Sequence, residues 1–325
     1  MRVRLFALLL LLPLLAGCHQ ADVHRTLARN LPANTEGLPV VLAVYEPWFG
    51  GPDHIDVGYS SHDRVVLAKQ IAQAQNMGIS AFVVDWYGSR HPFLDQSFAL
   101  LQQVARENHF KVALMYDEPQ DADDPTTTAI NSLDYAYNVY IGPQAANQDA
   151  YLTYNGRPVV FVWPRSKKTD WKAVRDHLGS WASAPVLINE FSETPYAAQF
   201  DGFYAWVQPG HGGWQSDGSN WGRDYLDYFY RTMQKRYPDK IAVGAAWPGF
   251  NDHKASWSQN RYMDARCGKT FEESLRLFRS YYTASDPLPF LMVETWNDYE
   301  EGTAIERGIN TCSGKQQGGN NTAGE

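Results

Sequence analysis

Two carboxylates three positions apart near the end of the chain are the residues best suited to chemistry. Asp298 and Glu301 follow an apolar run at 288–293, with Trp296 and Tyr299 beside them. Cleavage of a glycosidic bond typically needs two carboxyl groups: one donates a proton to the leaving oxygen, and the other activates water or acts on the sugar. The spacing therefore predicts a pair able to cleave a glycan, provided that the loop turns tightly.

Other polar and aromatic residues follow apolar runs at equivalent places. A single acid in such a position is more often a solvated loop residue or a hydrogen-bonded part of the scaffold. The aromatic residues could equally be core packing or platforms for sugar rings. Because the pattern recurs from run to run, we expect the set to bind substrate: Glu46, Trp48, Asp85, Trp86, Tyr87, Glu118, Glu190, Trp206, Trp247, Asp252 and Asn297.

Eight apolar, β-branched runs are available to position these side chains. Helical periodicity occupies most of the intervals between them, and alternating strands and helices indicate parallel βα units. The fold class predicted is α/β, a single (β/α)8 TIM barrel with long βα loops, whose active site would lie at the carboxyl ends of the strands. The expected strands are 40–45, 81–86, 112–116, 159–163, 186–188, 202–206, 241–246 and 290–296.

The helices are expected at 63–77, 94–107, 171–181, 224–237 and 271–284, with another near 129–140 inside a less regular stretch. Two of them have recognisable starts. Thr169 and Asp170 precede Trp171, and Thr270 precedes an apolar run with Glu273 at the spacing of a capping box.

Composition narrows the function further. The 325 residues are 44% apolar and 20% charged, with a net charge of −8, so one large core is possible and nucleic acid is not an expected partner. No Cys-x-x-Cys, His-Glu-x-x-His or Walker-type glycine loop is present, so no cofactor or metal is expected. His211, in a glycine-rich loop, is more often a hydrogen-bonding residue than a metal ligand.

The beginning of the chain indicates export. Arg2 and Arg4 precede a short leucine-rich run, which is typical of a secretory signal. Residues 15–18, ending in Cys18, resemble the bacterial lipobox, so we expect a signal peptide at 1–17 and lipidation of Cys18. A flexible linker at 18–37, the barrel at 38–312 and a disordered tail at 313–325 would follow. By resemblance to enterobacterial lipoproteins, in which an Asp after the lipidated Cys retains the chain in the inner membrane, His19 and Gln20 imply a lipoprotein of the outer membrane, facing the periplasm or the cell surface.

Two further cysteines remain, Cys267 and Cys312. An oxidising compartment would favour a disulfide between them, which would fasten the segment after the last strand to the loop after the seventh. Two free structural thiols are the alternative.

The motifs resemble those of glycoside hydrolase families 71 and 99. The resemblance is carried by Thr-Trp-Asn-Asp-Tyr-Glu-Glu-Gly-Thr at 295–303, by Tyr-Glu-Pro-Trp-Phe-Gly at 45–50 and by Pro-Gly-Phe-Asn-Asp at 248–252. It also includes the segments 78–88 and 155–160, and so spans most of residues 40–310 in barrel order. Family 71 comprises α-1,3-glucanases, and family 99 comprises endo-acting α-mannosidases and mannanases.

The resemblance implies roles for the two acids. The family 71 motif Trp-Asn-Asp-Tyr-x-Glu matches this chain, whereas family 99 has glutamate where Asp298 stands. Either likeness implies that Asp298 and Glu301 form the catalytic pair acting on an α-glucan-like or α-mannan-like glycan. We expect Glu301 to be the proton donor and Asp298 the base, because the shorter arm leaves room for an intervening water. The alternative is a carbohydrate-binding lipoprotein on the same barrel that performs no hydrolysis.

Overall fold

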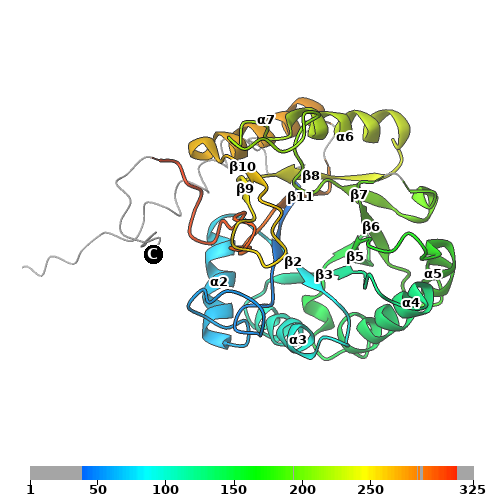
Figure 1. Ribbon diagram of the computed structural model, residues 1–325. Helices are drawn as coiled ribbons and strands as arrows, with labels where there is room; N and C mark the ends of the chain where they lie inside the picture. The colour runs from blue at the N-terminus through cyan, green and yellow to red at the C-terminus, as the bar shows by residue number, and fades with distance from the viewer. Residues whose placement is uncertain (1–38, 193, 284, 286–287, 313–325) are drawn as a thin grey trace, which may run out of the picture.

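The computed structural model describes residues 39–192, 194–283, 285 and 288–312. The expected signal peptide, Cys18, the linker, the tail and residue 38, the first position of the expected barrel, lie outside the described residues. The described chain forms eight parallel strands in a ring, surrounded by helices (Figure 1). The strands are β1 (Val40–Tyr45), β2 (Ala81–Trp86), β3 (Lys111–Asp117), β5 (Arg157–Trp163), β6 (Val186–Glu190), β7 (Gly202–Tyr204), β8 (Ile241–Ala246) and β11 (Phe290–Val293).

Strand pairing closes the ring and confirms the predicted barrel. β1 pairs with both β2 and β11, β3 pairs with β5, and each remaining strand is parallel to its neighbours in the chain. Three predicted strands have the observed bounds, and two were predicted too long at their carboxyl ends. β7 ends at Tyr204 and β11 at Val293, because the chain there leaves the ladder to form the loops of the rim.

The strands form because their residues suit burial on both faces. Val83 and Val44 are completely buried, as are their neighbours Ala43 and Phe82. Parallel strands covered by helices on one side and packed into a barrel on the other have little need for polar alternation, so they are continuous apolar runs. Barrel interior and helix-facing side chains join in one hydrophobic core.

Helices cover the outside of the barrel. They are α2 (Arg64–Asn76), α3 (Pro92–Glu107), α4 (Pro125–Ala136), α5 (Trp171–Leu178), α6 (Arg223–Arg236) and α7 (Lys269–Tyr281). Asp63, Asp124 and Asp170 cap α2, α4 and α5, each accepting hydrogen bonds from free amides of the first turn. The predicted capping box at Thr270 is wrong. α7 begins at Lys269, two residues before the predicted start, and the Thr270 hydroxyl instead donates to the Asp264 carbonyl.

Three connections depart from a regular βα alternation. After α4, a π-helix (Tyr137–Ile141) and the short strand β4 (Thr153–Tyr154) precede β5. Between β6 and β7 the described chain has only the 3-10 helix Ala197–Gln199. After β8, the two-stranded hairpin β9 (Phe250–Asn251) and β10 (Tyr262–Met263) projects over the rim (Figure 1).

A disulfide joins Cys267 to Cys312 across 45 positions. It connects the segment before α7 with the chain beyond β11, as the sequence predicts for a bonded pair. Within the described residues, no helix has the length and apolar character to cross a bilayer.

Candidate active site

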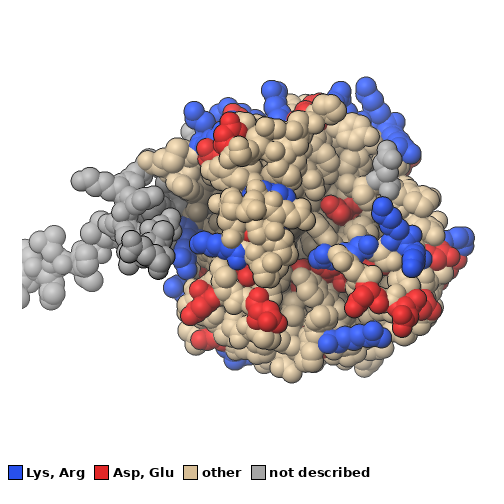
Figure 2. All heavy atoms as spheres, in the orientation of Figure 1, with Lys and Arg blue, Asp and Glu red and all other residues tan. Residues whose placement is uncertain are grey.

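A cavity of about 670 Å³ opens at the carboxyl ends of the strands. Figure 2 shows this face hollowed near its centre, with acidic atoms in the depth and basic side chains on either side. The cavity is lined by residues from strand ends and loops distributed around the barrel, as the TIM-barrel architecture dictates. Among them are eight of the predicted site residues: Glu46, Trp48, Asp85, Tyr87, Glu118, Trp206, Asp298 and Glu301.

The loop after β11 holds Asp298 by its backbone and by one carboxylate oxygen. Its amide donates to the Thr295 hydroxyl at 2.8 Å. Its Oδ1 accepts from the amides of Glu300 and Glu301 at 2.9 and 2.8 Å, which is the tight turn that a spacing of three requires. Burial raises the pKa of Asp298 well above its ordinary value and the Glu301 carboxylate raises it further, while the two amides oppose the shift.

Glu301 lies in the same cavity, and its side chain is 14% exposed. Its Oε1 accepts from the Trp257 indole Nε1–H at 3.0 Å and lies 3.5 Å from the Arg261 guanidinium. Burial raises the pKa of Glu301, while Trp257 and Arg261 lower it. Both carboxyls of the predicted pair therefore face one space, and burial shifts both toward the protonated form.

Other acids surround the pair. Burial raises the pKa of Glu46 well above its usual range, and Asp85 and Asp298 raise it further. Burial also raises the pKa of Asp85, and Asp117 adds to that shift while Arg165 opposes it. Burial and the mutual repulsion of these carboxyl groups therefore both favour their protonated forms.

Aromatic side chains form much of the remaining wall. Trp163 and Trp206 meet edge to face, with centroids 4.9 Å apart, and both line the cavity. Trp48 and Trp257 line it on another side, with centroids 6.0 Å apart. Flat apolar rings beside hydrogen-bonding acids suit a sugar, which presents apolar faces and hydroxyl edges.

Comparison with known proteins assigns the chain to a family. The model of glycosyl hydrolase family 71 matches residues 57–320. The chain belongs to glycosyl hydrolase family 71. Among curated proteins, a sequence search finds no match.

Solved structures share the fold of this family 71 glycoside hydrolase. Two structures of the GH99 endo-alpha-mannosidase from Bacteroides thetaiotaomicron are similar. One gives a TM-score of 0.64 at 17% identity, covering 82% of this chain and 87% of the other. The second, in complex with BIS-TRIS-propane, gives 0.62 at 18% identity, covering 82% and 86%. A glycoside hydrolase-like protein gives 0.57 at 18% identity, covering 84% and 87%.

Two predicted sugar platforms of the family 71 enzyme are instead core residues. Trp86 is fully buried; its Nε1–H donates to Asp95 at 3.0 Å, and its ring packs against Tyr135. Trp247 is also fully buried and stacks on Tyr225. Direct contact with a substrate was the wrong prediction for both, because a tryptophan at the end of a strand can turn outward beneath the helices.

Three predicted polar residues hold the scaffold. Asn297 accepts from the Glu46 amide at 2.7 Å and donates to the Glu46 carbonyl at 2.9 Å, so this predicted substrate-binding residue is buried and bonds the backbone after β1. Asp252 is completely buried and bonds its own loop, away from the cavity lining. Glu118 touches the cavity, but its Oε2 accepts from the amides of Arg165 and Ser166.

Glu190 lies at the end of β6, outside the cavity lining. Burial raises its pKa to about 7, and Arg165 opposes the shift. The charge of Asp117 also raises the Glu190 pKa, so Glu190 lies near the acids of the cavity. It does not line the cavity itself, so the predicted contact with substrate stays a prediction.

Among the lining residues that sequence analysis missed are two acid–base partners and two residues beside Glu301: Asp117, Arg165, Trp257 and Arg261. Asp117 forms a bidentate ion pair with Arg165 and is the last residue of β3, so the strand-end rule that selected Glu118 could have found it. Trp257 and Arg261 lie in the hairpin loop after β9, far from any barrel strand in sequence, and no local pattern marked them.

Proposed function

We propose that this family 71 enzyme hydrolyses α-linked glycans, with α-1,3-glucan as the preferred substrate, and that Asp298 and Glu301 perform the cleavage. The observation that carries the proposal is that both carboxyls of the 295–303 motif line one aromatic-walled cavity and both have raised pKa values. An acid kept protonated by burial is the group that can donate a proton to a leaving oxygen near neutral pH.

The proposed roles follow from how each carboxyl is held. The shorter arm of Asp298 leaves room for a water molecule, the two amides on its Oδ1 oppose the rise in pKa that burial causes, and the other oxygen stays outside these bonds. In the proposed step, Asp298 takes a proton from water as the water oxygen attacks the anomeric carbon. Glu301 gives its proton to the glycosidic oxygen, and the bond between that oxygen and the anomeric carbon breaks. The charge of the pair is unchanged, and one proton has moved from Glu301 to Asp298 through the reactants.

The choice of glucan over mannan rests on position 298. The family 71 motif has aspartate there, whereas the family 99 motif has a glutamate that assists the 2-hydroxyl of the sugar. The shorter aspartate arm is drawn back further by its two bonds to the loop amides. This geometry supports activation of water over attack by the sugar's own hydroxyl, and it leaves α-mannan as the alternative substrate.

A non-hydrolytic carbohydrate-binding protein would be favoured if Glu301 were fixed in an ion pair. Arg261 is the cation beside it, but the shorter contact of Arg261 is with Asp252, at 2.7 Å against 3.5 Å for Glu301. Asp252 is therefore the main partner of the Arg261 guanidinium, and Glu301 is a second, more distant partner. This favours the hydrolytic function over the non-hydrolytic one.

The test compares Glu301→Gln and Asp298→Asn with the native enzyme on α-1,3-glucan and α-mannan, measuring release of reducing ends. We expect each variant to lose about 1,000-fold in kcat on the true substrate, with little change in melting temperature. Glu107→Gln is the matched control, because that carboxylate lies exposed on α3 in a pair with Arg64. Native-like turnover by Glu301→Gln would refute the proposal, and binding of glycan without turnover by the native protein would favour the alternative.

A further inference from the structure

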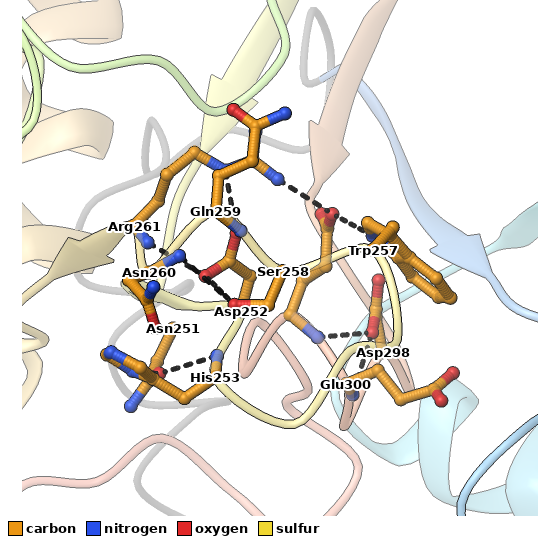
Figure 3. Close-up of polar contacts among 11 residues, drawn as sticks. Asn251, Asp252, His253, Trp257, Ser258, Gln259, Asn260, Arg261, Asp298 and Glu300 are labelled. Carbon is orange, nitrogen blue, oxygen red and sulfur yellow. Dashed lines mark hydrogen bonds and ion pairs between the residues drawn. The ribbon is translucent and has the colours of Figure 1, made fainter.

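The loop between β9 and β10 is organised around one buried carboxylate. Asp252 is completely buried and accepts from Ser258 Oγ at 3.1 Å, from the Gln259 amide at 3.0 Å and from Arg261 through both its amide and its Nε, at 2.8 and 2.7 Å. Figure 3 shows these bonds converging on Asp252 inside the loop. Because hydrogen bonds to a charged group are among the stronger ones, the loop has a defined shape.

This loop meets the catalytic loop at Glu301 in three ways. The Trp257 indole donates to Oε1, the Arg261 guanidinium lies beside the same oxygen, and the Asn251 amide donates to the Glu301 carbonyl at 2.7 Å. Gly302 permits the close approach, since it has φ +65° and a Cβ there would lie 3.1 Å from Asn251 atoms. Backbone and side chain of Glu301 are therefore both tied to the hairpin.

Trp257 is held in turn from its other side. Its ring meets Trp48 and His54 edge to face, and His54 stacks on Trp48 with centroids 4.7 Å apart. The His54 ring also bonds the Glu300 carboxylate at 2.7 Å. The indole is therefore fixed between the loop after β1 and the loop after β11, although 39% of its surface is exposed.

We infer that the loop from Asp252 to Arg261 is a clamp that fixes one oxygen of the Glu301 carboxyl and leaves the other to face the substrate. Trp257 and Arg261 are positioning residues in this clamp, and Asp252 holds the loop in the shape that presents them. The inference deepens the proposed function, because it assigns a control of the group that donates the proton.

The clamp also sets the acidity of that group. The charged groups that face Glu301 are Asp298 on its own loop, Glu46 after β1, Arg165 after β5, and Asp252 and Arg261 on the hairpin. Burial and the acids favour the protonated form, whereas the Trp257 N–H and the two arginines favour the ionised form. Loss of the indole N–H therefore raises the pKa of Glu301.

Trp257→Phe tests the clamp because it keeps an aromatic ring against Trp48 and His54 but removes the N–H. The primary measurement is the pKa of Glu301 itself, from the carboxyl ¹³C resonance assigned with Glu301→Gln. We expect it to rise by roughly one unit. If Glu301 is the proton donor, activity is lost as pH rises through its pKa, so the alkaline limb of kcat/KM should move upward by the same amount.

The matched control is Trp181→Phe, which removes an indole N–H that donates to Asp134 at 3.1 Å, outside the cavity. It should leave both the resonance and the pH profile at their native positions. An unchanged Glu301 pKa in Trp257→Phe would overturn the clamp whatever the activity. A raised pKa with an unmoved alkaline limb would support the clamp and count against Glu301 as the proton donor, so the two failures are distinguishable.

Discussion

At the scale of single residues, depth in the barrel separates acids that the sequence presents as equals. Glu294, Asp298 and Glu301 lie within eight positions of one another, and all follow or end the same apolar run. Glu294 is fully buried and outside the cavity lining, whereas the other two line it. Residue type and spacing therefore predicted the pair, but only the fold shows that Glu294 points into the interior.

Glu294 gives a prediction about stability and pH. Burial raises its pKa well above the ordinary value, with Glu190 adding to the shift and the Trp247 indole opposing it. The native state then binds a proton that the unfolded chain releases, so stability falls as pH rises from the unfolded pKa toward the folded one. Over that interval each pH unit costs the native protein about 1.4 kcal/mol. Glutamine is a neutral amide of the same shape, so the Glu294→Gln variant should not show this loss of stability with rising pH.

Thermal melts between pH 5 and pH 8 check this expectation. The melting temperature of Glu294→Gln relative to that of the native protein should increase steadily with pH. In Glu107→Gln, which removes an exposed carboxylate, the corresponding difference should stay flat. A pH-independent difference for Glu294→Gln would show that this carboxyl does not fold in its neutral form.

At the scale of elements, the sequence predicted those whose signal is local. All eight barrel strands were expected from apolar runs, because strands buried on both faces have few polar residues before their carboxyl ends. The sequence did not predict three short elements, namely the hairpin of β9 and β10, the π-helix and β4. Each strand or helix among them is two to five residues long and depends on distant partners. The helix start at Asp170 was predicted correctly. The predicted start at Thr270 was wrong, because the Thr270 hydroxyl bonds the Asp264 carbonyl and the Arg266 guanidinium in the preceding turn.

The cap at Asp170 makes the next prediction. Its carboxylate accepts from the amides of Lys172 and Ala173, which have no partner within α5. Asp170→Ala should lower the free energy of unfolding by about 1 kcal/mol, measured by urea denaturation. Asp176→Ala, on the same helix, removes only an exposed pair with Lys172 and should cost less. Equal losses in the two variants would mean that the cap contributes nothing of its own.

At the scale of the whole molecule, the cavity is a property of closure. Its wall takes residues from loops after β1, β2, β3, β5, β7, β8 and β11, and these meet only because β3 pairs with β5 to complete the ring. The sequence predicted which strand ends carry acids, since parallel strands share one edge. It could not show which tryptophans face inward, or that Trp257 and Arg261 reach Glu301 from a hairpin more than forty positions away in the chain.

The disulfide acts at this scale as well, because it joins the segment before α7 to the chain after β11 and encloses the whole catalytic motif in one loop. With 45 positions between the cysteines, the chain-entropy model assigns the bond about 4 kcal/mol of stability, mainly by restricting the unfolded chain. Replacing both cysteines by serine should lower the melting temperature by roughly 8 °C. Neither cysteine lines the cavity, so kcat at 25 °C should stay near the native value.

Reduction of the native enzyme should reproduce the loss, and the same reductant should leave the Cys267→Ser, Cys312→Ser double variant unchanged. If the double variant melts at the native temperature, the loop between the cysteines must already be restricted in the unfolded chain, or the bond must strain the folded one. If it melts lower and also loses kcat, the disulfide holds the 295–303 loop in its catalytic position. A loss of stability alone would not change turnover by the enzyme molecules that remain folded.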